Sequence, residues 1–276
     1  MVPEVCHELR RKLNAFLTEK PEDKVLRDVQ SQVQVSMKVI EKALSRYGPE
    51  QLSISYNGGK DCVVLLVLIL ACLPVWAFSS DPSPAASSNL SATLQTSTAK
   101  HPIKSPSQPP SSKPAVSPRS LQAVYIISEH PFAEVETFVE ASATGYSLDL
   151  DRYALPMRPG LEAYLLDKPK VEGIFVGTRR TDPHGETLTH FDPTDKDWPQ
   201  FMRIHPVIDW HYVEIWAFIR HLDIPFCSLY SQGFTSLGGM YDTHPNPALA
   251  VEGDPTKFRP AYELVEDGEE RLGRDR

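Results

Sequence analysis

The stretch SYNGGKD, residues 55–61, lies between two segments of different character. Residues 52–55 lean apolar and predict a short strand, while residues 62–73 form a continuous apolar run that predicts a buried helix. Loops between a strand and the start of a helix are where α/β proteins bind phosphate groups. We therefore interpret SYNGGKD as a candidate phosphate loop that opens an α/β fold.

The residue types in this loop suit an anion. Its two glycines permit positive φ angles and let backbone N–H groups approach a ligand closely. The N-terminus of the following helix favours negative charge, and the lysine adds a positive charge. Asp61 does not suit a phosphate contact, but it suits Mg²⁺ or a helix start. The alternative is a tight Gly-Gly turn with an exposed Lys-Asp pair.

The spacing of the loop excludes two common phosphate-binding motifs. The chain lacks GxxxxGK[ST] at this position, which excludes a Walker-type loop, and it lacks GxGxxG, which excludes a dinucleotide fingerprint. The remaining pattern resembles the PP-loop of the ATP-pyrophosphatase and PAPS-reductase superfamily. That resemblance implies a protein that binds the β,γ-diphosphate of ATP or a sulfonucleotide.

Apolar and helical segments alternate after the loop. The pattern predicts strands at 123–127, 148–155 and 173–177, with helices at 132–144 and 159–166. Such alternation is typical of a Rossmann-like α/β fold, with a parallel sheet covered by helices on both faces. Ligands in these folds bind beyond the carboxyl ends of the strands, so we expect the loops at 56–61, 128–131 and 178–184 to meet at one site.

The two ends of the chain have a different character. Apolar residues at helical spacing predict two amphipathic helices within residues 1–50, the second starting near Pro21 and ending at Gly48. One further helix is expected near 213–220, followed by a loop-rich region with many Gly, Pro and Asn residues. We therefore divide the chain into an N-terminal helical segment, 1–50, and an α/β domain, 51–276.

An insertion interrupts the α/β domain at about residues 79–119. Of these 41 residues, 20 are Ser or Pro. Such a composition buries too little apolar surface to offset the entropy of ordering the chain. We expect a disordered surface segment, and a PxxP partner site within it is an alternative with little support.

Composition excludes several classes of protein. The net charge of −8 argues against nonspecific nucleic-acid binding, which needs a basic face. The four cysteines form no CxxC pair, which argues against zinc and favours a reducing compartment. No signal sequence is evident, and the apolar run at 62–73 is too short to span a bilayer. We expect a cytoplasmic protein with no nucleic-acid or membrane partner.

Five further stretches carry chemically useful residues. The adjacent arginines of GTRRTDP (177–183) can clamp an anion at the end of a strand. The aromatic and Met side chains of TDKDWPQFMRIHPVIDW (194–210) can line an apolar slot for a planar ring. The alternative for the first stretch is a polar turn with a solvated pair of arginines, and for the second stretch ordinary core packing is nearly as good an explanation locally. The others are GFTSLGG (233–239), NPAL (246–249) and RPAYELVEDGEERLGR (259–274).

Together with SYNGGKD, these stretches resemble the eukaryotic FAD synthases (FMN adenylyltransferases), PAPS-reductase-like members of the PP-loop superfamily. The resemblance spans about residues 52–274 outside the Ser/Pro-rich insertion, and it is to the single-domain, fungal type. It implies an adenine nucleotide alpha hydrolase-like form of the Rossmann-like fold. It also implies a nucleotidyltransferase that converts FMN and ATP to FAD and pyrophosphate with Mg²⁺.

The resemblance assigns roles to individual positions. The implied set comprises diphosphate-binding Ser55, Asn57, Gly58, Gly59, Lys60, Arg179 and Arg180, flavin-binding Asp195, Trp198, Met202 and Arg203, and catalytic Asp61, Asp182, Arg271 and Arg274, with Asp61 as a Mg²⁺ ligand. Because the phosphate of FMN is already a nucleophile, no Ser–His or Cys–His pair is needed. The expected partners are ATP, FMN and client apo-flavoproteins, and a monomer is expected.

Three alternatives remain at this stage. A sulfonucleotide reductase on the same fold would need a cysteine nucleophile near the C-terminus, and the last cysteine is Cys227. An amidating or thiolating ATP-pyrophosphatase is opposed only by the resemblance. A non-enzymatic flavin-binding or scaffolding protein is opposed by the intact PP-loop residues.

Overall fold

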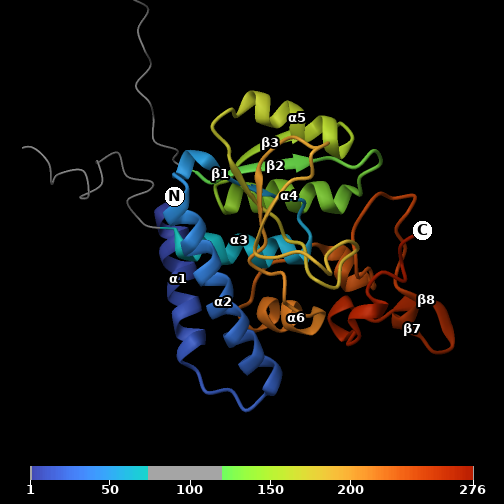
Figure 1. Cartoon of the computed structure of the whole chain (residues 1–276). Helices are drawn as coiled ribbons and strands as arrows, with labels where there is room; N and C mark the ends of the chain where they lie inside the picture. The colour runs from blue at the N-terminus through green and yellow to red at the C-terminus, as the bar shows by residue number, and fades with distance from the viewer. Residues whose placement is uncertain (1, 74–119, 276) are drawn as a thin grey trace, which may run out of the picture.

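The computed structural model describes residues 2–73 and 120–275 (Figure 1). A twisted sheet lies in the upper part of the molecule with helices above and below it, and two long N-terminal helices lie beside it. The expected Ser/Pro-rich insertion at 79–119 lies outside the described residues. The mostly parallel α/β architecture predicted from the sequence is confirmed.

The main sheet contains six strands in the order β3-β2-β1-β4-β6-β5. All neighbouring pairs are parallel except β5 and β6, which run antiparallel. The central strand β1 pairs with β2 on one side and β4 on the other. The strands are β1 (Leu52–Ser55), β2 (Gln122–Ile126), β3 (Asp149–Tyr153), β4 (Gly173–Phe175), β5 (Phe191–Pro193) and β6 (Met202–Ile204).

Helices cover both faces of this sheet, as the alternating pattern predicts. α3 (Lys60–Cys72) and α4 (Ala133–Gly145) lie on one face, and α5 (Met157–Asp167) lies on the other (Figure 1). α3 is apolar on every side because it is enclosed by the sheet, the N-terminal helices and α6 (Tyr212–His221). It begins at Lys60, two residues earlier than predicted, because Gly59 takes the N-cap position.

The N-terminal helices belong to the same hydrophobic core as the sheet. They are α1 (Val2–Thr18) and α2 (Lys24–Arg46). The expectation that the second helix starts near Pro21 is wrong, because Asp23 accepts a hydrogen bond from Val25 N at 2.8 Å and caps the helix. A buried polar link adds to the apolar packing: Trp210 donates to Ser36, and Ser36 donates to the carbonyl of Pro206.

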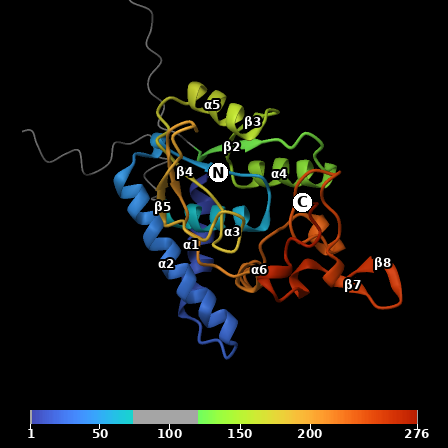
Figure 2. The same cartoon turned by 45° about the vertical axis from the view of Figure 1, so that its right-hand side comes forward.

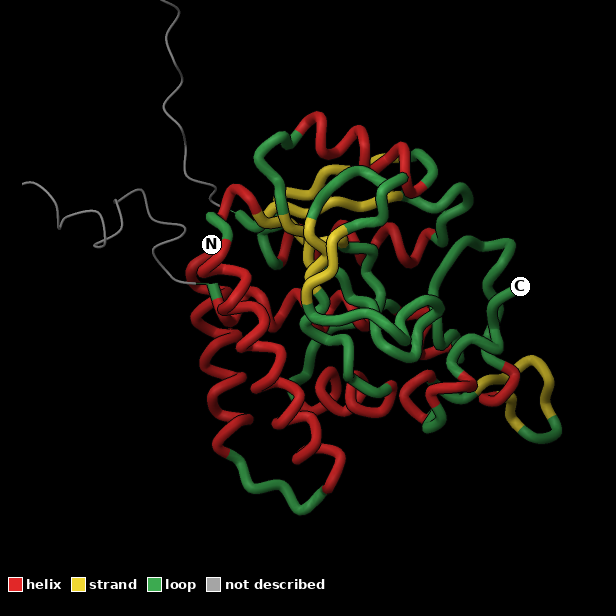
Figure 3. Tube along the Cα trace, in the orientation of Figure 1, coloured by secondary structure: helices red, strands yellow, loops and turns green. Residues whose placement is uncertain are grey.

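The C-terminal region is rich in loops, as expected (Figure 3). After α6 come 3₁₀ turns at Ser228–Gln232, Pro247–Leu249, Ala261–Glu263 and Asp267–Glu269, and a small hairpin, β7 (Ala250–Val251) with β8 (Asp254–Phe258). Figure 2 shows this hairpin projecting away from the sheet, while the chain returns toward the start of α3. Within the described ranges, no helix has the length and apolarity that a membrane crossing requires.

The short hairpin of β5 and β6 was not predicted, and it buries a histidine directly after β6. His205 is 1% exposed, and neither ring nitrogen has a hydrogen-bond partner among the residues that the structure describes. Burial lowers the pKa of His205 to about 4. A buried neutral imidazole therefore occupies a site that would suit an apolar side chain of similar size.

Acid should therefore destabilise the protein through His205. The pKa of this histidine is lower in the folded chain than its usual 6.5, so the unfolded chain binds more protons as the pH falls from about 6.5 to about 4. We expect the native protein to lose about 2 kcal/mol more than a His205→Leu variant between pH 7 and pH 5. Urea unfolding at both pH values measures this difference. Equal losses of unfolding free energy in the native protein and in His205→Leu would contradict this expectation. His7→Gln, which replaces an exposed histidine, is the control and should lose as much as the native protein.

Candidate active site

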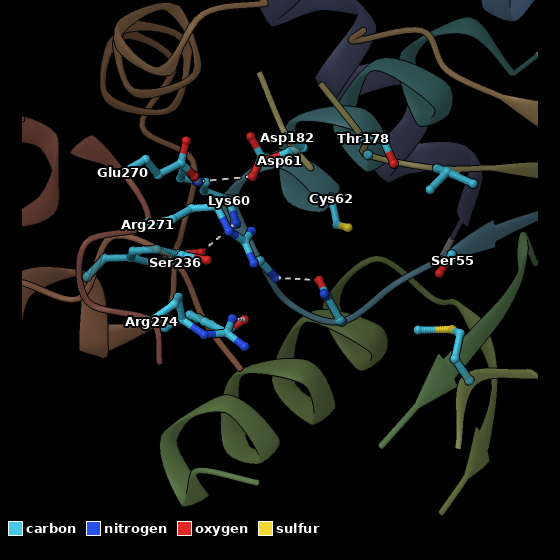
Figure 4. Close-up of a pocket in the computed structure, with 17 residues that line it drawn as sticks. Ser55, Lys60, Asp61, Cys62, Thr178, Asp182, Ser236, Glu270, Arg271 and Arg274 are labelled. Atoms are coloured by element: carbon cyan, nitrogen blue, oxygen red, sulfur yellow. Dashed lines mark hydrogen bonds and ion pairs between the residues drawn. The ribbon is translucent and has the colours of Figure 1, made fainter. Parts of the chain in front are cut away.

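A cavity of about 280 Å³ opens where the loops after β1 and β4 leave the carboxyl edge of the sheet (Figure 4). The chain continues from β1 to β2 and β3 on one side, whereas β4 and β6 lie on the other. Crevices at such switch points are the usual ligand sites of open α/β sheets. The residues expected from the sequence that line it are Ser55, Asn57, Gly59, Lys60, Asp61, Asp182, Arg271 and Arg274.

The SYNGGKD loop has a backbone shape that needs glycine at one position. Gly58 has a φ of +72°, and a Cβ at this residue would lie 2.8 Å from a methyl group of Val139. Asn57 stabilises the turn by accepting a hydrogen bond from Gly59 N at 2.9 Å. Gly59 is the N-cap of α3 and supplies no side-chain cap. The N-terminus of α3 therefore meets the cavity without a side-chain hydrogen bond from its N-cap residue.

A tyrosine from the C-terminal region supports the start of α3. The hydroxyl of Tyr230 accepts a hydrogen bond from Lys60 N at 2.9 Å, and the ring is almost fully buried. Tyr230 also lines the cavity. It satisfies one of the N–H groups that a helix start leaves unpaired. The loop is thus fixed from outside as well as by its own turn.

The side chain of Lys60 is buried rather than extended into solvent. It is 2% exposed and forms ion pairs with Asp61, at 3.0 Å, and with Glu270. Its ammonium group also lies 5.1 Å from the centroid of the Tyr212 ring. Burial lowers the pKa of Lys60, but the two carboxylates outweigh burial and raise it overall. Lys60 therefore stays charged and holds two acidic side chains at the cavity.

Arg179, the first arginine of GTRRTDP, is the hub of the site. Its side chain is fully buried, and it contacts carboxylates from three separate segments of the chain. Burial lowers its pKa, but Asp61 and Glu270 raise it overall, so the guanidinium remains charged. Its partners are Asp61 at 2.8 Å, Asp267 at 3.5 Å, Asp182 at 3.7 Å, and Glu270.

The buried cluster carries more negative than positive charge when all groups are ionised. Four carboxylates surround two cations, which leaves two excess negative charges. Burial, followed by the charge of Asp61, raises the pKa of Asp182. Asp61 behaves oppositely: burial raises its pKa, but Arg179 and Lys60 outweigh burial and lower it. The site therefore favours an additional cation close to Asp182.

A tight turn after Arg179 fixes the position of Asp182. The carboxylate of Asp182 accepts a hydrogen bond from Arg179 N at 2.8 Å. Gly185 closes the turn, since a Cβ at Gly185 would overlap the carbonyl oxygen of Arg179. Gly177 likewise lets the loop after β4 approach the start of α3 closely, because a Cβ added at this position would lie 3.2 Å from Cys62 N. The loops after β1 and β4 are thereby held against each other.

The two terminal arginines both line the cavity, but their surroundings differ (Figure 4). Arg274 donates to the carbonyls of Leu237 and Asp242, each at 3.2 Å, and forms an ion pair with Asp242 at 3.4 Å. The exposed guanidinium of Arg271 has no hydrogen-bond or ion-pair partner among residues 2–73 and 120–275. Arg271 is therefore free to bind an anion without first breaking an ion pair.

Buried polar groups hold the segment that carries these arginines. Thr235 donates to the carbonyl of Glu270 at 2.6 Å, and Asn246 donates to the carbonyl of Glu269 at 2.8 Å. Thr235 and Asn246 also hydrogen-bond to each other at 2.8 Å. These residues belong to the GFTSLGG and NPAL stretches. The stretches that suggested a loop near a site thus contact the terminal segment directly.

The second arginine of GTRRTDP points away from the cavity. Arg180 pairs with Asp209 at 2.7 Å and donates to the carbonyls of Glu186 and Leu188. Its side chain is 42% exposed. The structure therefore separates the two arginines that the sequence treated as a pair. The predicted roles of both in binding diphosphate stay predictions.

The four residues predicted to contact flavin lie on or beside the β5–β6 hairpin. Asp195 and Trp198 are exposed in the connecting turn, and Met202 begins β6. Arg203 donates to the carbonyl of Pro193 at 2.9 Å, while its Nε is buried and has no hydrogen-bond partner within the described part of the chain. None of these four residues lines the described cavity. Their role in binding flavin stays a prediction.

Three residues of the site were not predicted from the sequence: Tyr230, Asp267 and Glu270. Asp267 accepts a hydrogen bond from Tyr212 N at 2.6 Å and so stabilises the start of α6. Glu270 is 5% exposed. Both acidic residues lie in an acidic stretch that looks solvated, and only the tertiary structure shows that Glu270 is buried beside Lys60 and Arg179 and that Asp267, which is partly exposed, contacts Arg179.

The site fits the Mg²⁺ ion that the family resemblance implies. Asp61 Oδ1 is buried and accepts no well-aligned hydrogen bond, and the carboxyl of Asp182 also faces the cavity. Mg²⁺ in nucleotide sites is commonly bound by one or two carboxylates together with substrate phosphates. Within the described ranges, no group of three or more His, Cys, Asp or Glu residues forms a complete metal site. The two carboxylates therefore suit a metal that arrives with a phosphate ligand.

A cysteine nucleophile is not available in the cavity lining. Cys62 contributes to this lining. Burial, and then the nearby charge of Asp61, raise its pKa to about 12. A thiol with such a pKa is protonated near neutral pH and is a poor nucleophile. The arrangement favours charge stabilisation of an anionic ligand over covalent catalysis.

Comparisons with known proteins agree with this geometry. Residues 152–245 match the phosphoadenosine phosphosulfate reductase domain family. A probable FAD synthase from Schizosaccharomyces pombe is 34% identical over 262 residues, which cover 95% of this chain and 85% of that protein.

Solved structures of Candida glabrata FMN adenylyltransferase are also similar. The complex with FAD and inorganic pyrophosphate is 26% identical, with a TM-score of 0.80 and coverage of 99% of each chain. The complex with FMN and the ATP analogue AMPCPP is 25% identical, with a TM-score of 0.78 and coverage of 99% of each chain.

Substitution of the two adjacent arginines should have very different effects on stability. Arg179→Gln removes the fully buried cation that four carboxylates contact, and we expect a loss of about 3–5 kcal/mol in the free energy of unfolding. Arg180→Gln removes an exposed ion pair and should cost at most about 1 kcal/mol. Urea unfolding of the two variants measures the contrast. Losses of similar size would show that Arg179 is not the hub of a buried cluster.

Proposed function

The chain belongs to the FAD synthase family, and we propose on that premise that it transfers the AMP part of ATP to the phosphate of FMN, giving FAD and pyrophosphate. One observation carries the proposal. The SYNGGKD loop, Asp182 and the terminal arginines are far apart in the sequence but line a single cavity at the carboxyl edge of the sheet. That cavity combines an anion-binding helix start, carboxylates and free cationic charge.

The reaction needs one bond to form and one to break. An oxygen of the FMN phosphate attacks the α-phosphorus of ATP, and the bond between this phosphorus and the bridging oxygen of the leaving pyrophosphate breaks. The electron pair of that bond leaves with the pyrophosphate. The attacking phosphate oxygen is already anionic near neutral pH, so no side chain has to remove a proton. Catalysis then depends on in-line positioning and on stabilisation of negative charge.

We assign the charge-stabilising groups by their positions in the cavity. The backbone of Asn57–Gly59 and the N-terminus of α3 suit the β,γ-diphosphate of ATP. Arg271 and Arg274 suit the reacting phosphates, because both guanidinium groups reach the cavity. Lys60 lines the cavity and Arg179 is buried behind the lining, and both act by holding the carboxylates.

Asp61 and Asp182 are the proposed holders of Mg²⁺. Bound there, the ion would neutralise charge on the phosphates of ATP. Asp182 also keeps Arg179 close to the cavity through its contact with Arg179 N. The two excess negative charges of the cluster support this assignment, because they favour an additional cation.

The flavin side of the substrate is proposed from the family resemblance. Asp195, Trp198, Met202 and Arg203 are the proposed contacts of the isoalloxazine ring. The unpartnered Nε of Arg203 supports a polar role, since a buried donor without a partner is costly. Trp198 is 37% exposed and offers a flat apolar face.

A sulfonucleotide reductase on the same fold is the alternative, and we favour it less. That class of enzyme needs a reactive cysteine. Cys227 is completely buried, and burial raises its pKa. A thiolate nucleophile instead needs a lowered pKa and exposure to its substrate.

Three further properties are proposals. We propose a monomer, a cytoplasmic location, and transfer of FAD to client apo-flavoproteins. The four free thiols support a reducing compartment. Light scattering of the purified protein measures the first of these properties.

The proposed activity has a direct test. We expect the protein, incubated with FMN and MgATP, to release FAD and pyrophosphate in a ratio of one to one. Asp182→Asn should lower kcat by about 100-fold or more, because it removes a charge next to the reacting phosphates. Chromatography of the flavins and a coupled pyrophosphate assay measure both products. Absence of FAD with the native protein would contradict the proposed reaction. A near-native kcat in Asp182→Asn would contradict the proposed role of Asp182.

The position of Arg274 can be tested through a neighbouring glycine. A Cβ at Gly238 would overlap the guanidinium of Arg274, whereas at Gly239 the nearest atom would lie 3.5 Å away. We expect Gly238→Ala to lower kcat by about 10- to 100-fold, because a displacement near 1 Å has effects of that size. Gly239→Ala is the matched control and should retain activity. The melting temperature of both variants should remain near that of the native protein, and equal activities would argue against a role for Arg274.

A further inference from the structure

The side chain of Glu270 connects two parts of the site that come from distant segments. One carboxylate oxygen pairs with Lys60 at the start of α3, and the other pairs with Arg179 in the loop after β4. The residue is 5% exposed, so water screens these contacts only weakly. Glu270 is therefore a charged bridge between the two loops that form the cavity.

The backbone of Glu270 is also fixed. Its carbonyl accepts the hydrogen bond from Thr235 at 2.6 Å, and a weaker one from Asn246 at 3.5 Å. Thr235 is 2% exposed and Asn246 is fully buried. Both the side chain and the main chain of Glu270 are thus held by buried groups. The direction in which the chain leaves Glu270 is set by these contacts.

The next residue in the chain is Arg271. Arg271 lines the cavity, and its side chain has no hydrogen-bond or ion-pair partner among the described residues. Arg274, by contrast, is tied to Leu237 and Asp242. The placement of Arg271 therefore depends on the residue before it. An arginine that is placed before the reaction needs no reorganisation when charge develops on the substrate.

We propose that Glu270 is a positioning residue, which fixes Arg271 over the cavity by joining the terminal segment to Lys60 and Arg179. This inference rests on the proposed function, because the benefit of a fixed Arg271 is stabilisation of the reacting phosphates. Glu270 lines the cavity as well, but both of its carboxylate oxygens are already paired, one with Lys60 and the other with Arg179. It acts through Arg271, and loss of its charge affects the rate through the position of that guanidinium.

A double-mutant cycle tests this dependence. Glu270→Gln keeps the size of the side chain and leaves three carboxylates around the two buried cations, so we expect the variant to fold. It should lower kcat by about 10- to 100-fold, and Arg271→Ala should lower it by about 100-fold or more. The double variant should have a kcat within about 3-fold of Arg271→Ala alone, because both changes remove the same interaction.

Two outcomes of the cycle would overturn the proposal. One is a kcat for Glu270→Gln that stays within about 2-fold of the native value. A change of that size is too small for the displacement of a catalytic charge. The other is a double variant whose loss equals the product of the single losses, as expected for independent effects. Glu269→Gln, an exposed neighbour, is the matched control and should leave kcat unchanged.

A second variant covers the case in which Glu270→Gln does not fold. Thr235→Val removes the hydroxyl that donates to the carbonyl of Glu270 and keeps the buried charges. It should lower kcat by about 3- to 10-fold, an effect that also disappears in the Arg271→Ala background. Retention of the full effect in that background would count against the proposal.

Limited trypsin digestion separates this proposal from the proposed function. We expect cleavage after Arg271 to be at least about 5-fold faster in Glu270→Gln than in the native protein, since cleavage requires local release of the segment. Mass spectrometry of the released peptide measures the rate. If the native protein forms no FAD, the proposed function fails, and the digestion still decides whether Glu270 holds the terminal segment. Equal cleavage rates would contradict that anchoring role.

Discussion

The buried guanidinium of Arg179 is the interaction on which the rest of the site depends. It contacts carboxylates from the start of α3, from its own loop and from the terminal segment. A charge removed from water is tolerated only when its partners are close and well placed. The cluster therefore holds three distant parts of the chain in one arrangement, and the cavity at the carboxyl edge of the sheet is a consequence of it.

The same cluster explains how an acidic protein can bind polyphosphate. Its two excess negative charges would repel a nucleotide if nothing compensated them. We propose that compensation comes from the N-terminus of α3, from Arg271 and Arg274 at the cavity, and from a metal ion that would accompany ATP. The carboxylates of the cluster therefore have two roles in the proposed site. They suit an additional cation, and they hold the basic side chains of Lys60 and Arg179 in place. Net charge alone, at −8, gives no indication of this local balance.

Local sequence patterns predicted much of the fold and the outline of the site. The strand, loop and helix around SYNGGKD follow from neighbouring residues, and so do the alternating elements up to β4. The hairpin of β5 and β6 was missed because strands of three residues are too short to show an alternating apolar pattern, and β5 also contains Pro193. The start of α2 was missed because Asp23 caps the helix more effectively than Pro21 begins it. Burial was the main gap: Arg179 and Arg180 are identical side chains, and only tertiary packing makes the first a buried hub and leaves the second at the surface.

The central claim is that this cavity joins the α-phosphate of ATP to FMN. Incubation of the protein with FMN and ATP labelled with ³²P at the α position tests it most directly. We expect the label to appear in FAD, whereas label at the γ position should appear only in pyrophosphate. Accumulation of the α label in free AMP, with unlabelled flavin, would contradict the account and indicate a different acceptor for the activated nucleotide.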